Sequence, residues 1–391
     1  MQNPILVLNC GSSSIKYALL SDETPERVEG LAENLGLDTA RIKHTDINGE
    51  KIEISLAGAN HQWALQKILG LLAAYQPVAV GHRVVHGGRE FSHAVKVDQH
   101  VLAEVKRLKV LAPLHNPAHA LGIEAVQKIY PDLPQVVVFD TAFHQTMPAK
   151  AYRYAIPKDL YNEHYIRRYG FHGSSHAYVG HRADDLVANN QPNGWITTHL
   201  GNGCSLTAVY EGVSLDTSMG LTPLEGVVMG TRSGDVDPSL HIHLQRILGY
   251  SLDQIDTILN KQSGLLGISG ISSDMRTVEQ AANEGNDDAK LAIEIFCYKA
   301  ARYIASLSCA LPTFTGIVFT GGIGENSATI RQKILDNLPH FGIKADANQN
   351  SELSRGAEGS FHQPDSKLQL WVIPTDEEYQ IAKETKEVLS L

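Results

Sequence analysis

The sequence predicts an α/β protein made of two similar halves, and three observations lead to this prediction. Short, nearly continuous apolar runs at 5–8, 135–139 and 316–320 are typical of buried strands. Stretches with apolar residues at helical spacing separate these runs. A third pattern, in which an Asn/Gly/Ser turn joins two apolar strands, occurs at 5–20 and again at 195–210. Because one copy lies in each half, we expect a duplicated domain whose halves face each other across a cleft.

The elements of the first half follow from their composition. We expect a strand, turn and strand at 5–20, a polar mixed region at 28–62 with a hairpin turn at Asn48-Gly49, and a helix at 63–75. A short strand at 78–80 precedes two helices, at 101–111 and 118–129, separated by a break at 113–117 that contains two prolines. The apolar run at 135–139 should be a central strand, and its end carries Asp140. Pro148 and Pro157 bracket a connecting region, where we place the first domain boundary.

Expected strands and helices also alternate along the second half of the chain. A helix should follow the 169–176 segment and run to about 188, and further helices are expected at 252–259, 289–307, 327–338 and 374–389. The expected strands are at 195–200, 206–210, 316–320 and 368–373. Asn326 or Ser327 can cap the helix that begins near 327. The acidic residues that open the last helix suit its dipole.

Composition and charge exclude several classes of function. With 391 residues the chain can form two domains, and 43% hydrophobic with 19% charged residues describes a soluble globular protein. A formal net charge of -10 argues against a nucleic-acid or anionic-membrane partner. An anionic substrate would therefore need local positive charge, so the Arg and Lys residues inside motifs matter most.

The expected location is the cytoplasm. Cys10, Cys204, Cys297 and Cys309 are scattered without metal-ligand spacing, as in a protein with reduced thiols. The first four residues lack the basic region of a signal peptide. No apolar run approaches the ~20 residues that span a bilayer.

Two glycine-rich segments can bind phosphate. The turn at 9–14 collects backbone N–H groups and hydroxyls beside Lys16, which suits an anion, although it lacks the Walker-A ending and most such turns are only turns. We expect Gly321–Asn326 to form a loop between a buried strand and a helix start, where phosphates or nucleotides bind. Close packing of a strand–helix corner also selects glycine, so this segment alone does not decide between the two interpretations.

Several charged residues stand where they could carry chemistry. Arg83 and Arg232 are flanked by glycines, which allow a close approach to a bound carboxylate or phosphoryl group. His172 is a candidate donor to developing charge, with a structural core histidine as the alternative. Asp140, Asn9 and Glu377 offer oxygen ligands, and Mg²⁺ needs only one or two from the protein. Each could instead cap a helix or stabilise a turn, as could Asp274 before Met275 and Arg276.

Taken together, these motifs resemble the acetate kinase family within the superfamily of actin, sugar kinases and chaperone ATPases. The matching segments run in order along the chain, at 9–16, 81–88, 139–148, 169–176, 199–205, 219–226, 230–234, 321–326 and 374–378. The resemblance implies two duplicated actin-like (ribonuclease-H-like) domains with a cleft between them. It places the N-terminal lobe at 1–148 plus 378–391 and the nucleotide-binding lobe at 149–377.

The resemblance also implies a function: reversible, Mg²⁺-dependent phosphorylation of acetate by ATP to acetyl phosphate and ADP. Mn²⁺ would be an alternative metal, and the enzyme would be a cytoplasmic homodimer, with helices such as 289–307 as candidates for the contact. Asn9 and Glu377 would bind the metal, Arg83 the acetate carboxylate, and His172, Arg232 and Asp140 would be catalytic. Val85, Leu114, Phe171 and Pro223 would line the methyl pocket. The nucleotide would be held by Ser12, Ser14, Lys16, His199, Leu200, Gly201, Asn202, Gly203, Asp274, Met275, Arg276, Gly322, Ile323, Gly324, Glu325 and Asn326. The departures from the family pattern, Cys10 and Ser174, remove no required group.

Physical chemistry agrees with these roles. Acetate resembles a Glu side chain, with a pKa of ~4.3, and is already a nucleophilic anion at pH 7. The difficulty is repulsion between the carboxylate and the γ-phosphate, which cations and fixed donors relieve. A proton-abstracting role for Asp140 is therefore unnecessary, and contact with Mg²⁺ waters or orientation of an Arg fits better.

Two rival functions stay open. A propionate or butyrate kinase of the same family differs by methylenes worth only ~1–3 kcal/mol each. Related propionate kinases tend to carry a smaller residue at the position of Val85, so the resemblance favours acetate. A non-metabolic actin-like ATPase is the second rival. A chaperone of this kind needs a peptide-binding domain, and no residues follow Leu391 to build one.

Overall fold

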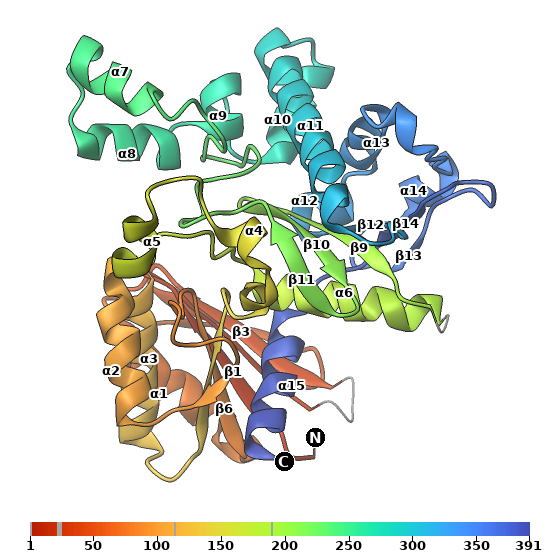
Figure 1. The fold of residues 1–391 in the computed structure, drawn as a ribbon. Helices are drawn as coiled ribbons and strands as arrows, with labels where there is room; N and C mark the ends of the chain where they lie inside the picture. The colour runs from red at the N-terminus through yellow and green to blue at the C-terminus, as the bar shows by residue number, and fades with distance from the viewer. Residues whose placement is uncertain (1, 22–25, 113–114, 189–190) are drawn as a thin grey trace. The chain divides into compact units, whose positions relative to one another are not determined.

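The computed structural model describes residues 2–21, 26–112, 115–188 and 191–391. The expected methyl-pocket residue Leu114, and the proline at 113 that was expected to break a helix, lie outside these ranges. The chain divides into two compact units, one formed by Met1–Gln145 with Asp376–Leu391 and the other by Thr146–Thr375. Each unit is built around one β-sheet with helices packed on it (Figure 1).

The first unit contains an eight-stranded sheet. Its order is β5 (Lys51–Ser55), β4 (Arg41–Thr45), β3 (Arg27–Glu33), β2 (Ile15–Leu20), β1 (Ile5–Cys10), β6 (Ala79–Val84), β8 (Gln135–Phe139) and β7 (Val95–Lys96). The strand β1 pairs antiparallel with β2 and parallel with β6, and β6 pairs parallel with β8. The carboxyl ends of β1, β6 and β8 therefore meet at one edge of the sheet.

Helices cover both faces of this sheet. On one face, α1 (His61–Leu72) and α3 (Asn116–Ile129) pack against Leu6, Leu8 and other core residues, and α2 (Gln99–Arg107) lies beside α3. On the other face, α15 (Glu377–Leu389) packs against β1, β6 and β8 (Figure 1). The approach of α15 is close, because a Cβ built on Gly81 of β6 would lie 2.5 Å from Thr385. The last helix of the chain thus completes the first unit.

The second unit repeats the central strand order of the first. Its sheet runs β11 (Val213–Thr217), β10 (Cys204–Tyr210), β9 (Gly194–Leu200), β12 (Gly316–Thr320), β14 (Gln369–Val372) and β13 (Gly359–Ser360). Its antiparallel strands β11, β10 and β9 are followed by the parallel strands β12 and β14, just as β3, β2 and β1 of the first unit are followed by β6 and β8. The two sheets share this topology, and it confirms the duplication predicted from the paired Asn/Gly/Ser hairpins.

Helices α6 (Gly173–Val187) and α11 (Asp287–Leu307) pack on the second sheet, and further helices surround α11. The others in this unit are α4 (Ala149–Tyr152), α5 (Lys158–His164), α7 (Leu240–Leu248), α8 (Leu252–Lys261), α9 (Gly264–Ser269), α10 (Met275–Asn283), α12 (Gly321–Asn326), α13 (Ala328–Asp336) and α14 (Ala347–Glu352). Short 3-10 helices occur at Ala73–Tyr75, Leu108–Val110, Phe143–Thr146, Ser308–Ala310 and Pro339–Phe341. No helix among the described residues has both the length and the apolar character to cross a membrane.

The structure corrects the sequence reading in three regions. The polar region 28–62 contains the antiparallel strands β3, β4 and β5, of which β5 is mostly exposed and so lacks the apolar pattern of a buried strand. The connecting region after Pro148 contains the short helices α4 and α5. The Gly321–Asn326 segment is a helix and not a loop, and contacts described below explain its form.

Candidate active site

Four of the expected site residues in the first unit share one face of its sheet. Alternation along β1, β6 and β8 places Asn9, Arg83 and Asp140 on the face where Ile5, Ala79 and Val138 pack against Ile381 of α15. Lys16 is the cross-strand partner of Asn9 and shares this face. Glu377 and Glu378 form the first turn of α15 on the same side. The sheet edge and one helix start therefore bring basic and acidic groups together.

Arg83 and Asp140 form a bidentate ion pair. The Nε atom of Arg83 donates to Oδ1 of Asp140 at 2.8 Å, and its Nη2 atom donates to Oδ2 at 2.7 Å. Glu377 Oε2 lies 3.9 Å from Arg83 Nε. Burial alone would lower the pKa of Arg83, but Asp140 and Glu377 outweigh it and raise that pKa. Burial also raises the pKa of Asp140, and the Arg83 guanidinium opposes this rise. The ion pair fixes the direction of the Arg83 guanidinium.

Lys16 is paired with Glu378, at 2.5 Å between Nζ and Oε1. Burial would lower the pKa of Lys16, but Glu378 outweighs it and the net shift is upward. The lysine side chain is 55% exposed, so it can exchange this partner for a phosphate. In the adjoining turn, Gly11 N donates to Ser14 O at 2.8 Å, while Ser12 is exposed and Ser14 is partly buried.

Two histidines of the second unit are held by serine hydroxyls. His172 Nδ1 lies 2.9 Å from Ser205 Oγ, and His199 Nδ1 lies 2.8 Å from Ser175 Oγ. The two rings stack with centroids 4.3 Å apart. His172 has φ +56 at the start of α6, a left-handed conformation that turns the chain sharply before the helix. Both rings are therefore fixed through Nδ1.

Arg232 lies beside His172 and carries a charge that no carboxylate of the described chain neutralises. A Cβ built on Gly203 would lie 3.3 Å from His172 Nε2 and 3.5 Å from Arg232 Nη1, so both side chains reach the backbone of this turn. Burial lowers the pKa of Arg232, and its Nη1 atom contacts Met229 Sδ at 3.7 Å. A partly buried guanidinium without a counter-ion is costly unless an anion binds. The arrangement fits a phosphoryl group.

A cavity of about 760 Å³ opens beside this turn in the second unit. It is lined by Gly201, Asn202, Ser273, Asp274, Met275, Arg276, Glu279, Gly322, Ile323, Asn326 and Ser327. Eight of the expected nucleotide residues are among them. Asp274 caps α10 by accepting from Arg276 N, and it also binds the Arg276 guanidinium, with Oδ2 2.6 Å from Nη2. Asp274 therefore both caps α10 and lines the cavity.

The Gly321–Asn326 helix is held from behind. Gly321 adopts φ +76, and a Cβ there would lie 2.7 Å from Leu200 O. The Glu325 carboxylate accepts from Gly321 N at 2.9 Å and from Thr375 N at 3.1 Å, and it is not among the lining residues of the cavity. The helix end is fixed by Arg331, whose Nη1 atom donates to Gly324 O at 2.8 Å and to Glu325 O at 3.0 Å. These contacts explain why the glycines form a helix.

The expected methyl-pocket residues belong to different units. Val85 is buried in the first unit, whereas Phe171 is buried and Pro223 partly buried in the second. Their convergence on one acyl group therefore stays a prediction.

A model of the acetokinase family matches residues 4–383. The chain belongs to the acetokinase family. It is 53% identical over 390 residues to an acetate kinase of Ectopseudomonas mendocina, covering 98% of each chain. A crystal structure of a propionate kinase from Francisella tularensis aligns with a TM-score of 0.94 at 46% identity, covering 99% of this chain and 100% of that one. The Porphyromonas gingivalis acetate kinase structure aligns with a TM-score of 0.93 at 44% identity, with the same coverage.

In this acetokinase-family chain, the structure adds residues that sequence reasoning missed. Arg331 is fully buried and donates to main-chain and Asn350 oxygens, although an Arg in a helix normally indicates a solvated face. Glu279 lines the cavity from the middle of α10. Its distance of three residues from Arg276 places the two on one helix face, and this was the one available signal.

Proposed function

We propose that this chain catalyses the reversible, ATP-dependent phosphorylation of acetate to acetyl phosphate and ADP. Membership of the acetokinase family and full-length relatives named acetate kinase support the reaction. The single structural observation that carries the proposal is the pairing of Arg232 with His172 beside the Gly203 turn, because an uncompensated cation at the edge of a nucleotide-sized cavity suits a transferring phosphoryl group.

The reaction needs charge neutralisation more than proton transfer. Acetate attacks the γ-phosphorus with a carboxylate oxygen, the bond from phosphorus to the β,γ-bridging oxygen breaks, and ADP leaves as an anion. In our proposal Arg232 and His172 donate to the transferring phosphoryl oxygens, and Arg83 holds the acetate carboxylate. Asp140 keeps the Arg83 guanidinium in one orientation, so the pair is ready before acetate binds.

Magnesium is part of this proposal, with Mn²⁺ as an alternative. Asn9 and Glu377 provide the oxygen donors that a hard cation prefers, and they lie on the face of the sheet against which α15 packs. When bound, the metal would neutralise charge on the phosphate oxygens. Glu377 Oε2 lies 3.9 Å from Arg83 Nε, so the Glu377 carboxylate would interact both with the metal and with the arginine proposed to bind acetate.

The nucleotide would occupy the 760 Å³ cavity. Its phosphates would lie near Gly201–Gly203 and Gly322, where backbone N–H groups can donate. Lys16 stays a proposed nucleotide contact. Ser12, Ser14, His199, Leu200, Met275, Ile323, Gly324 and Asn326 remain proposed parts of this binding region. Glu325 would act through the geometry of α12, because its carboxylate is engaged with Gly321 and Thr375.

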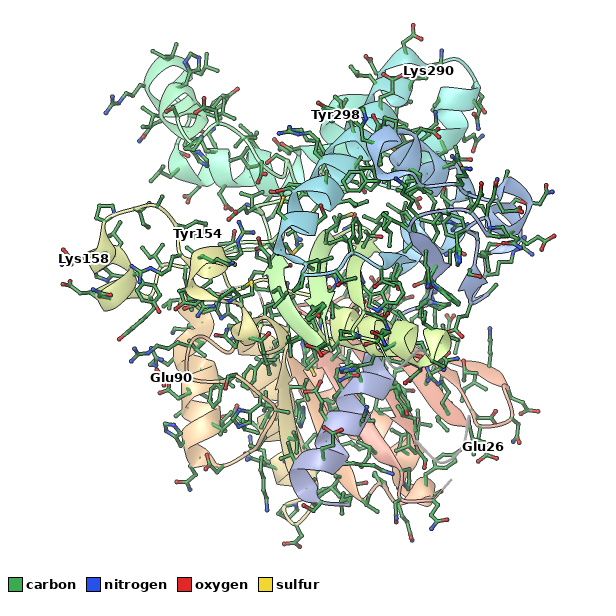
Figure 2. The ribbon with its side chains drawn as sticks, turned by 45° about the vertical axis from the view of Figure 1, so that its right-hand side comes forward. Glu26, Glu90, Tyr154, Lys158, Lys290 and Tyr298 are labelled. Carbon is green, nitrogen blue, oxygen red and sulfur yellow. The ribbon has the colours of Figure 1, made fainter. Side chains whose placement is uncertain are left out.

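A homodimer in the cytoplasm completes the proposal. The helix α11 exposes Leu291 and Tyr298, and Figure 2 shows Tyr298 and Lys290 on this helix. The hairpin of α7 and α8 also exposes large apolar residues, among them Ile247 and Leu252. Such surfaces fit a second copy of the chain. The four cysteines are free, three of them buried, which suits a reducing compartment.

A hydroxamate assay with acetate, propionate and butyrate tests the function. We expect acyl phosphate from ATP and acetate, less with propionate and least with butyrate. Arg232→Ala should lower kcat by at least about a hundredfold, whereas exposed Arg246→Ala should not change it. ATP hydrolysis without acyl phosphate would contradict the proposal, and a preference for propionate would favour the activity named for the Francisella relative.

A further inference from the structure

The cavity beside the Gly203 turn contains an acidic residue to which neither the sequence motifs nor the proposed phosphate contacts assign a role. Glu279 lies on α10 and lines this cavity together with Ser327. The Ser327 hydroxyl donates to Glu279 Oε1 at 2.8 Å. Because Ser327 also caps α13 by accepting from Ile330 N at 3.1 Å, the carboxylate is held at a fixed point of the wall. No other hydrogen bond to this carboxylate is found among the described residues, so Oε2 can accept from a ligand.

The position of Glu279 identifies which end of a nucleotide it faces. Asp274 caps α10, and Glu279 lies five residues further along it, a rise of about 7 Å. Ser327 follows the C-terminal end of α12, whereas Gly322 lies in its first turn. The Gly201–Gly203 turn and Gly322 therefore mark one end of the cavity, and Glu279 with Ser327 marks the other. A carboxylate at the phosphate end would repel the ligand, so it must face the nucleoside.

We infer that Glu279 is a specificity-determining residue that accepts a hydrogen bond from the 6-amino group of adenine. This inference rests on the proposed use of ATP. A fixed carboxylate stabilises a bound base whose edge donates a hydrogen bond to it. It destabilises a base with a 6-oxo group at the same place, because two acceptors repel each other. Burial raises the pKa of the Glu279 carboxyl, and the Ser327 hydroxyl opposes this rise. Measurements are therefore made at pH 8, on the alkaline side, which favours the ionised carboxylate.

The experiment compares dissociation constants by calorimetry for ADP, purine riboside diphosphate, which lacks the 6-amino group, and inosine diphosphate. The wild-type protein should bind ADP roughly tenfold more tightly than the purine riboside analogue. Glu279→Leu should abolish this preference. Glu279→Gln keeps the shape of the side chain and can still contact Ser327. It should reduce the preference for ADP and raise the affinity for inosine diphosphate relative to that for ADP. Glu294→Gln makes the same chemical change at an exposed position of α11 that does not line this cavity, and it should leave every ratio unchanged.

Several outcomes would overturn the inference. One is an unchanged ADP preference in both Glu279 variants. Another is an equal loss of affinity for ADP and the purine riboside analogue, which would mean a general disturbance of the cavity. A third is a loss of discrimination against 2′-deoxy-ADP alone, which would place Glu279 on the ribose. Binding is measured without turnover, so this test is independent of the hydroxamate assay. If that assay failed while the ADP preference still depended on Glu279, the proposed acetate phosphorylation would be rejected and the adenine contact would stand.

Discussion

Replacing Asp140 by asparagine tests the proposed geometry of the first unit most directly. Asp140 accepts two charge-assisted hydrogen bonds from Arg83, at 2.8 and 2.7 Å, and its side chain is 3% exposed. Asparagine can keep one of these bonds through its amide oxygen, but its NH₂ group opposes the other guanidinium N–H. One charge-assisted bond and the buried counter-charge are lost, at a cost of about 2–3 kcal/mol. That corresponds to roughly a 30- to 150-fold fall in kcat/KM for acetate.

The same change should alter metal dependence. Without the Asp140 charge, Arg83 is drawn to Glu377, which already lies 3.9 Å away. Glu377 is then less available as an oxygen ligand, and the Mg²⁺ concentration for half-maximal activity should rise roughly tenfold. The hydroxamate assay at varied acetate and Mg²⁺ measures both effects. Asp216→Asn, a partly buried aspartate of the second unit, serves as the matched control.

One result would refute this reasoning. If Asp140→Asn shifted only the pH profile and left the Mg²⁺ dependence unchanged, Asp140 would act as a proton acceptor and not as the residue that orients Arg83. Circular dichroism and the thermal midpoint of the variant distinguish a local effect from loss of the fold.

Three further predictions concern selectivity, stability and positioning. Val85→Ala should raise the ratio of kcat/KM for propionate over acetate by roughly tenfold, and an unchanged ratio in the hydroxamate assay would remove Val85 from the acyl pocket. Burial lowers the pKa of His82 to about 4, so the unfolded chain binds a proton below pH 6.5 that the native protein refuses. The contribution of His82 to the free energy of unfolding is therefore fully present above pH 6.5 and falls by about 2 kcal/mol between pH 6.5 and 5. Urea titrations should find the total loss over this range smaller by about this amount in His82→Gln than in the wild type. Arg331→Lys should raise KM for ATP roughly tenfold with KM for acetate unchanged, because Arg331 fixes α12, which lines the proposed nucleotide cavity, to the main chain at 350–353; equal rises in both KM values would contradict a positioning role.

The elements that the sequence predicted well are those with one dominant local signal. The run 135–139 is a strand over the predicted residues because every side chain is buried, and the opening hairpin has the expected strand ends. The strand β5 was missed because four of its five residues are exposed and give no apolar run. The glycines of α12 suggested a loop, since Glu325 and Arg331, which hold them in a helix, are themselves held by Thr375 and Asn350, 50 and 19 residues further along the chain.

The candidate site was predictable to the extent that its residues stand in short motifs. Arg83, Asp140, His172 and Arg232 were found from glycine neighbours, strand ends and the family resemblance. Their hydrogen-bond partners were not predicted from the sequence. His172 contacts Ser205 and His199 contacts Ser175, and these pairs are 33 and 24 residues apart in the chain. Glu279 carried no motif, and only the cavity around it indicates a role.

The last helix of the chain, α15, belongs to the first unit, and this has a consequence for folding during synthesis. During synthesis, the strands β1, β6 and β8 emerge long before α15, so Ile5, Val7 and Val138 lack their cover while the whole second unit is translated. A nascent or truncated chain ending before residue 376 would present this apolar sheet face to chaperones and to other chains. It would also lack Glu377, the proposed metal ligand, so the proposed metal position and the core of the first unit are completed together by the final helix.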